Sequence, residues 1–328
     1  MIAAKLAAAP ADKLSRTHVV TCISNPILYN SRYVLYKQFE KYMRDSGATL
    51  TTVELATGDR NFMVTDPSNP FHKQVRSVDD LWHKENLQDI GVQHLSVNPA
   101  TKDWENVLFV DADVAFANPN WFVESWQMLQ RYEVVQLWSQ AIDLTPNYTM
   151  FQKHKGFVSA YIDSGYKSPD ASSYESWHPG FAWGFTRNAY KTLGGLIDFS
   201  ILGAGDRHMA LGLIGAMREG DQAIPVEITD GFKQRLFQWQ DRAVRYLRKD
   251  IGFVPGMVLH YYHGRKVNRF YKSRWKILIE NKYDPNTDIK YDEAGVLQIV
   301  DEDPRQILLR DNIRAYFSAR NEDDISVG

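Results

Sequence analysis

Cysteine is almost missing from this sequence, since Cys22 is the single one among 328 residues. A disulfide bond within the chain is therefore excluded, and so is a metal site built from several thiolates. Cys22 lies in the segment 17–23, which has the pattern of a buried strand. We interpret it as an ordinary core residue.

Long apolar runs and a strong charge of one sign are absent as well. No stretch reaches the roughly 18–20 apolar residues of a membrane-spanning helix. The first ten residues are rich in alanine but contain Lys5 and end at Pro10, which makes a poor secretory signal. We expect residues 1–16 to be a loosely ordered leader of a soluble, cytoplasmic protein. The net charge of −2 does not indicate a globally basic nucleic-acid binder.

Two common catalytic motifs are also lacking. The sequence has no Gly-x-x-x-x-Gly-Lys phosphate loop, which argues against an ATPase or GTPase. It has no Gly-x-Ser-x-Gly elbow either, which argues against an α/β-hydrolase.

The hydrophobic pattern that is present alternates between strand and helix. Strand patterns cover 19–23, 51–56, 107–110 and 134–138, and helical patterns cover 32–45 and 77–88, the second capped by Ser77. This alternation predicts an α/β fold with a mostly parallel central sheet flanked by helices.

The second half is less regular and predicts a mixed arrangement. We expect strands over 178–185 and 257–262, helices over 209–217 and 233–249, and an outer helix over about 304–320. We expect one domain over 17–282, with halves at about 17–140 and 141–282. A C-terminal, Asp-rich helical extension would cover 283–328.

Ligands of such sheets collect where strands end, which here points to Asn25, Asp59 and the pair Asp111 and Asp113. Two carboxylates so close repel each other, and partial burial raises the cost. A divalent cation such as Mn²⁺ or Mg²⁺ relieves that repulsion. Strand periodicity turns both aspartates to one side, so both could hold the same ion. The alternative is a solvated turn that happens to contain two aspartates.

The stretch Trp104–Phe116 resembles the Asp-x-Asp region of glycosyltransferases with the GT-A fold. The resemblance spans about 17–275 and implies a Rossmann-like sheet. It also implies that Asp111 and Asp113 hold a metal ion bridging the diphosphate of a nucleotide-sugar, with UDP favoured. Asn25 and Asp59 would then lie near the nucleotide, although a plain turn is the simpler interpretation of Asp59.

Three further stretches match the family in the expected order. Residues 81–87 are similar to a helix that lends Lys84 and Asn86 to the nucleotide, although these two do not share a helix face. Residues 178–206 are similar to the acceptor half, which implies acceptor contacts by His178, Trp183 and His208. Asp206 would be the base that deprotonates the acceptor hydroxyl, or simply a helix cap, a position at which Asp is favoured.

The third stretch, 260–266, implies a histidine that completes the metal site, with Arg265 and Lys266 on the phosphates. His260 and His263 are an odd number of residues apart and should not both face inward on a strand. We therefore favour His263.

These features together predict a metal-dependent glycosyltransferase that uses a nucleoside-diphosphate sugar, with an inverting reaction favoured. Residues 233–276 contain twelve Lys or Arg and two Asp, a net charge of +10, with aromatics interleaved. That pattern is typical of contact with a polyanion such as DNA, so the acceptor could be a hydroxymethylated base. The alternatives are a polysaccharide or glycolipid acceptor, a metal-dependent nucleotidyltransferase, and a protein that binds a nucleotide-sugar without catalysis.

Overall fold

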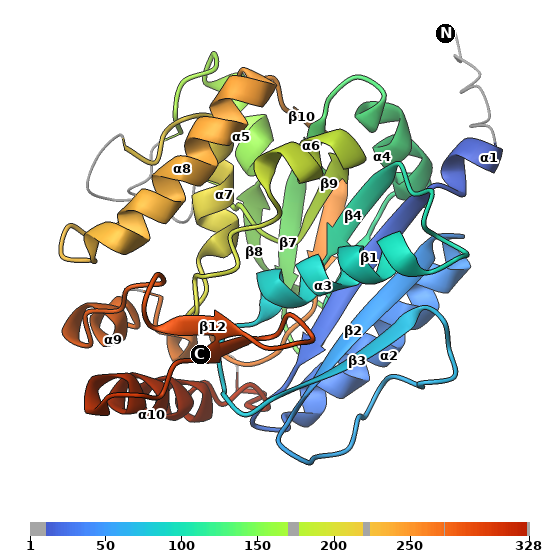
Figure 1. Cartoon of the computed structure of the whole chain (residues 1–328). Helices are drawn as coiled ribbons and strands as arrows, with labels where there is room; N and C mark the ends of the chain where they lie inside the picture. The colour runs from blue at the N-terminus through green and yellow to red at the C-terminus, as the bar shows by residue number, and fades with distance from the viewer. Residues whose placement is uncertain (1–10, 170–176, 219–223, 272, 327–328) are drawn as a thin grey trace, which may run out of the picture.

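The central sheet of this computed structural model is mostly parallel, as the sequence predicts (Figure 1). The structure describes residues 11–169, 177–218, 224–271 and 273–326. Within them the sheet has the order β10–β6–β9–β4–β1–β2–β3. The strands β1 to β4 are mutually parallel, whereas β9 runs antiparallel to β4 and β6. The bounds are β1 Thr17–Ser24, β2 Thr49–Thr57, β3 His72–Ser77, β4 Asn106–Val110, β6 Val134–Gln136, β9 Ala182–Thr186 and β10 Gly252–Phe253.

Helices cover both faces of this sheet, which explains the continuous apolar runs of its strands. On one face, Val19 of β1 joins Phe39 and Met43 of α2 (Asn30–Asp45) in one apolar cluster. On the other face, Val20 packs with α3 (Lys84–Val97). A side chain at Gly91 of α3 would place its Cβ 2.5 Å from Val20, so glycine permits this close approach.

A second, smaller sheet has the order β5–β11–β7–β8. Its strands are β5 Val114–Phe116, β7 Gln140–Leu144, β8 Met150–Lys155 and β11 Met257–His260. The register sets His260 at the end of β11 beside Val114 on one neighbour and Asp143 on the other. This pairing places Val114, Asp143 and His260 side by side on three strands, with Asp113 directly before Val114.

Helices form the remainder of the described second half. Figure 1 shows α8 (Asp230–Leu247) lying across α7 (Gly205–Leu213), and it buries Phe232, Leu236 and Trp239. The shorter helices α5 Phe157–Asp163 and α6 Arg187–Leu193 also belong to this half, whereas α4 Trp121–Leu129 lies in the first half. No helix among the described residues is long and apolar enough to cross a membrane.

The C-terminal part adds a layer at the carboxyl end of the parallel strands. It contains the 3₁₀ turn η1 (Lys266–Arg269), α9 (Trp275–Glu280), the hairpin β12 (Ile289–Tyr291) and β13 (Leu297–Ile299), and α10 (Pro304–Ala319). Asp303 and Gln306 form a capping box at the start of α10, and Leu309, Ile313 and Phe317 are buried. The chain after α10 stays largely at the surface, but it buries Arg320 and Glu322.

The helix expected over 77–88 is wrong in both its cap and its start. Ser77 does not cap a helix: it ends β3, and its hydroxyl accepts a hydrogen bond from the backbone N–H of Asp79. The helix begins only at Lys84, because residues 72–77 pair in register with β2. The expected leader falls mainly on residues 1–10, outside the described residues, while Ala11–Leu14 forms the short helix α1.

Candidate active site

A cavity of about 370 Å³ lies at the carboxyl ends of β1 and β4. Its walls come from β1, from the loop between β4 and β5, from the starts of α3 and α7, and from the residues that follow β11 and α10. Charged side chains of both signs line it, including Lys84, Asp113, Asp206, Lys266 and Glu322. This is the position at which ligands of open α/β sheets bind.

The two aspartates that follow β4 take different partners inside this cavity. Oδ1 of Asp111 lies 2.6 Å from Nζ of Lys84. Oδ2 of Asp113 lies 3.1 Å from Nε2 of His263 and 4.0 Å from Nε2 of His260. The chain passes between the two sheets here. The backbone N–H of Asp111 donates to Phe181, just before β9 of the large sheet, and the carbonyl of Asp113 accepts from Tyr261, just after β11 of the small sheet. A shared metal on both carboxylates stays a prediction, whereas Asp113 is the one that meets the histidines.

Asp113, His260 and His263 offer ligand atoms that lie within 4.8 Å of one another. The expectation that only one histidine could face inward is wrong, because β11 ends at His260 and the alternation of a strand no longer applies at His263. Oδ1 of Asp113 is buried and has no hydrogen-bond partner among the described residues. A buried acceptor left unpaired is costly, and a cation would satisfy it. Two imidazoles and a carboxylate suit Mn²⁺ better than Mg²⁺, which prefers oxygen ligands.

Asp143 on β7 orients this group from behind. Its carboxylate is 2.7 Å from Nδ1 of His260 and 2.7 Å from Nε2 of His154, and it also pairs with Lys266. Burial alone would raise the pKa of Asp143, but the hydrogen bonds from the two histidines and the charge of Lys266 lower it well below its usual value. Since a carboxylate only accepts hydrogen bonds, Nδ1 of His260 must carry a proton. In the neutral ring, Nε2 then keeps a lone pair that can bind a metal.

Replacing Asp143 with Asn should weaken Mn²⁺ binding by about 10- to 100-fold, because His260 would no longer be held in the ligating tautomer. Titration of Mn²⁺ followed by electron paramagnetic resonance measures this without any substrate. Asp163→Asn is the control, since Asp163 pairs with Lys155 at the surface. Equal Mn²⁺ affinities for wild type and Asp143→Asn would contradict the orienting role.

Asp206 stands at the start of α7, where Ala204 adopts a left-handed conformation with φ 75°. One carboxylate oxygen accepts a hydrogen bond from the backbone N–H of Arg207 at 2.8 Å. The other is so near the loop after His178 that a Cβ at Gly180 would lie 2.7 Å from it. Asp206 lines the cavity, as a base acting on a bound hydroxyl must.

A second carboxyl group, Glu85, is buried beside Lys84 and accepts a hydrogen bond from the indole N–H of Trp82 at 3.1 Å. Burial, with a smaller contribution from Asp206, raises the pKa of Glu85 to about 7 despite the charge of Lys84. The folded protein therefore keeps this proton at pH values where the unfolded chain has lost it. Stability from this group falls as pH rises from the usual carboxyl range toward 7.

Glu85→Gln should consequently melt at a higher temperature than wild type at pH 8 and at about the same temperature at pH 5. Gln is neutral, like the protonated carboxyl. At pH 8 the substitution removes a buried charge, whereas at pH 5 the carboxyl of Glu85 is already protonated in the folded protein and little changes. Thermal unfolding by circular dichroism at both pH values checks this. A stabilisation that is equal at pH 5 and pH 8 would show that the pKa of Glu85 is not raised.

Several residues predicted for ligand binding lie at or near the cavity. Asn25 lines it, with its side chain bonded in both directions to the backbone of Tyr29. His178 lines it and stacks on Phe181 at 4.2 Å, and burial lowers its pKa well below the usual value. Lys266 lines the cavity, while Arg265 lines an adjoining one of about 100 Å³. Trp183 is buried and donates its indole N–H to Pro179.

Three predicted residues lie elsewhere. Asn86 binds the backbone of Gly295 and Leu297 and so holds the C-terminal hairpin instead of a nucleotide. Asp59 is exposed in the turn after β2 and is not among the cavity residues. His208 is fully buried near Ser200, Phe232 and Trp275, because the face of α7 that carries it packs into the core.

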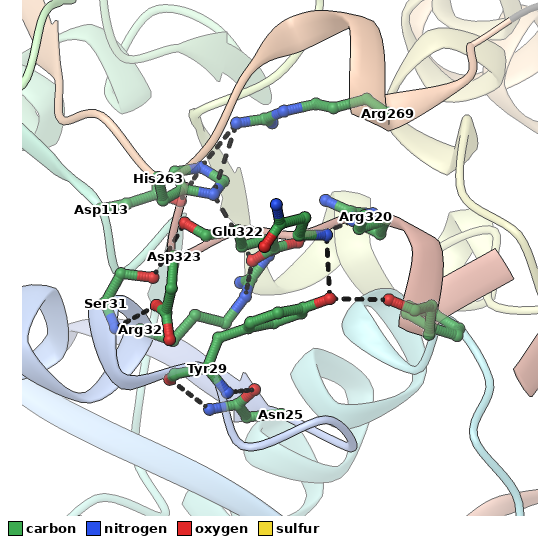
Figure 2. A network of polar contacts seen from close by, with 12 residues as sticks. Asn25, Tyr29, Ser31, Arg32, Asp113, His263, Arg269, Arg320, Glu322 and Asp323 are labelled. Atoms are coloured by element: carbon green, nitrogen blue, oxygen red, sulfur yellow. Dashed lines mark hydrogen bonds and ion pairs between the residues drawn. The ribbon is translucent and has the colours of Figure 1, made fainter. Parts of the chain in front are cut away.

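A cluster of arginines near Glu322, shown in Figure 2, has no counterpart among the residues predicted from the sequence. Arg32 of α2, Arg269 of η1 and Arg320 after α10 come together at the cavity with Glu322. No sequence pattern signals this cluster, because Arg32, Arg269 and Arg320 come from three separate parts of the chain.

Comparison with known proteins gives structural likeness only. No protein-family model and no curated protein matches the chain. The catalytic domain of Drosophila β1,4-galactosyltransferase 7 is 10% identical, with 89% of this chain and 98% of that chain covered at a TM-score of 0.38. Mannosyl-3-phosphoglycerate synthase from Rubrobacter xylanophilus is 11% identical, with 88% of each chain covered and a TM-score of 0.38.

A nucleotide-diphospho-sugar transferase from Desulfovibrio desulfuricans, described as putative, is 11% identical, with 92% and 98% covered at a TM-score of 0.32. Two of these three proteins are named as sugar transferases, the kind of protein that the sequence resembles. The TM-scores describe a loose likeness of shape.

Proposed function

We propose that the chain is a metal-dependent glycosyltransferase that moves a sugar from a nucleoside-diphosphate sugar to an acceptor hydroxyl. The observation that carries this proposal is the group of Asp113, His260 and His263, with its unpaired buried oxygen, in a cavity that also holds Asp206. A cation-binding group, a carboxylate base and several cationic side chains are the parts that such a transfer requires.

Each part has a role in the reaction. Asp113, His260 and His263 would hold a divalent ion, which would supply positive charge for the leaving diphosphate. Lys266, whose charge Asp143 orients, and Lys84 add to that charge from the cavity wall. Asp111 contacts Lys84 at 2.6 Å. Burial lowers the pKa of Lys84, but the negative charges of Asp111 and Glu85 raise that pKa above the usual value. Lys84 therefore stays cationic.

Asp206 serves as the base. The acceptor oxygen forms a bond to the anomeric carbon of the sugar, and its proton passes to the carboxylate of Asp206. The bond from that carbon to the diphosphate oxygen breaks, and the electron pair leaves with the diphosphate. Attack from the side opposite the leaving group makes the reaction inverting. His178, beside Gly180 and Asp206, and Trp183 beneath that loop shape the acceptor side.

A polyanionic acceptor finds less support than the donor chemistry. The basic stretch 233–276 divides into two parts: α8 contributes no residue to the cavity, whereas Lys266, Arg269 and Arg274 line it. On α8, Arg242 donates to the backbone of Leu193, and Arg218 pairs with Asp241. A DNA acceptor therefore stays a prediction of the sequence alone.

A thermal-shift screen of nucleotide-sugars with and without Mn²⁺ tests the proposal. Ligands that bind only the folded protein raise its melting temperature. We expect at least one nucleoside-diphosphate sugar, with UDP-sugars first in the screen, to raise it only when Mn²⁺ is present. Free sugars and nucleoside monophosphates are the matched controls. If no nucleotide-sugar shifts the melting temperature and none is hydrolysed, the proposal fails.

A further inference from the structure

The segment after α10, residues 320–326, is held against the cavity from several sides. The carboxylate of Asp323 accepts hydrogen bonds from the backbone N–H groups of Asn30 and Ser31, each at 2.8 Å, and so caps α2. The hydroxyl of Tyr29 accepts from the backbone of Asn321 at 2.9 Å and donates to Phe317. Gly264 packs so closely that a Cβ there would lie 2.7 Å from Cα of Glu322.

Glu322 is the residue of this segment that enters the charged end of the cavity (Figure 2). Its side chain is 5% exposed and pairs with Arg32 at 3.0 Å and with Arg320 at 2.6 Å. Its carboxylate is 3.6 Å from Nδ1 of His263. Burial would raise the pKa of Glu322, but Arg32 and Arg320 lower it well below its usual value, so the group is an anion.

The cations around Glu322 outnumber it. Arg269 comes within 2.9 Å of His263 and makes no ion pair with a carboxylate among the described residues. Three guanidinium groups therefore lie near two carboxylates, those of Glu322 and Asp113, and beside His263, which contacts Asp113. The diphosphate of a nucleotide-sugar carries two negative charges, whereas a carboxylate carries one, and guanidinium groups bind phosphate oxygens in a bidentate fashion.

We propose that Arg32, Arg269 and Arg320 form a subsite for a phosphate group of the donor, and that Glu322 fills this subsite when no phosphate is bound. That the phosphate belongs to a sugar donor rests on the proposed function, whereas the subsite itself requires only an anion. Phosphate and Glu322 compete for the same arginines. Binding of the ligand is therefore coupled to release of residues 321–324, with the same coupling free energy in both directions.

Hydrogen exchange of the wild-type protein tests this coupling without any variant. Pyrophosphate is the probe, in buffer that contains a chelator so that metal binding plays no part. We expect pyrophosphate to speed the exchange of the backbone amides of Asn321–Asp324, since the segment is displaced. Slower or unchanged exchange of these amides at saturating pyrophosphate would overturn the proposal, because the segment would then close over the ligand or ignore it.

Variants of the same segment give a second, quantitative test. Glu322→Gln removes the competing charge with little change of shape and should tighten pyrophosphate binding by about tenfold, the factor that corresponds to 1.4 kcal/mol. Asp324→Asn is the matched control, since it removes one charge two residues away, where the carboxylate bonds only to Ser326 among the described residues. Isothermal titration calorimetry with chelator measures both affinities.

Arg32→Gln should weaken pyrophosphate binding by about tenfold on the same scale. If Glu322→Gln binds pyrophosphate no more tightly than wild type, or Arg32→Gln binds it equally well, the subsite does not exist. None of these measurements uses a sugar or a metal. A subsite confirmed in a protein that transfers no sugar would therefore refute the proposed function and leave this inference standing.

Discussion

Asp113→Asn is expected to lose Mn²⁺ binding and to lower metal-dependent turnover by at least about 10³-fold, since a metal ion contributes several kcal/mol to stabilising the leaving group. Asp113 provides the only carboxylate in the cation-binding group of the described residues, and one of its oxygens is buried without a partner. Asn keeps the shape of the side chain but removes the charge. Paramagnetic resonance of Mn²⁺ and release of nucleoside diphosphate measure the two effects.

Two further variants make this experiment decisive. Asp59→Asn changes an exposed turn residue outside the cavity and should leave both measurements unchanged. Asp111→Asn separates two arrangements. If Asp111 mainly holds Lys84, as its 2.6 Å contact indicates, its loss should affect Mn²⁺ affinity less than the loss of Asp113. Equal losses would favour a metal shared by both aspartates, as the sequence predicts. Full Mn²⁺ binding by Asp113→Asn would refute the metal site.

Asp206→Asn is expected to lower kcat by about 10²- to 10⁴-fold, the usual contribution of a general base, while Mn²⁺ and donor affinity stay near wild type. The carboxylate lies at the cavity, between the start of α7 and the loop at Gly180. Asn retains the hydrogen bond to the backbone of Arg207 but accepts no proton. Steady-state kinetics together with Mn²⁺ titration separates catalysis from binding.

The competing interpretation treats Asp206 as a helix residue with no part in catalysis. Asp230 also lies in the first turn of a helix, α8, and is exposed, so Asp230→Asn is the control for that role. If Asp206→Asn and Asp230→Asn both lower stability slightly and leave kcat within a few-fold of wild type, Asp206 is not the base. A selective loss of kcat in Asp206→Asn supports the proton transfer described above.

The parallel core was predictable because its pattern is local. Apolar runs such as 107–110 and the helical spacing of 32–45 depend on neighbours a few residues apart, and both elements are present. The strand His72–Ser77 was missed because its sequence is polar and has no apolar strand pattern. It is a strand because it pairs with β2 at the edge of the sheet. Its identity as a strand depends on a partner, which no single stretch of sequence specifies.

The residues of the site also fall into those that a local pattern indicates and those that only contacts between distant segments bring together. Asp113, His263 and Asp206 follow strands or open helices, so their positions could be inferred from order along the chain. Asp143 gave no signal, since it reaches His260 only through the register of β7 with β11. His260 was set aside by an alternation rule that stops applying where the strand ends. The arginines around Glu322 depend on contacts between α2, η1 and the chain after α10, which sequence patterns do not report.

The hydrogen bonds between Asp323 and the start of α2 join residues 292 and 293 positions apart. During synthesis, α2 emerges long before Asp323, the residue that caps it. The first backbone N–H groups of α2 therefore lack this hydrogen-bond partner until residue 323 has been made. Closing so large a loop carries an entropic cost that contacts already made by the core would reduce. Assembly of the charged pocket is therefore expected to be a late event in folding. Early intermediates would hold a formed sheet whose ligand end is still hydrated and open.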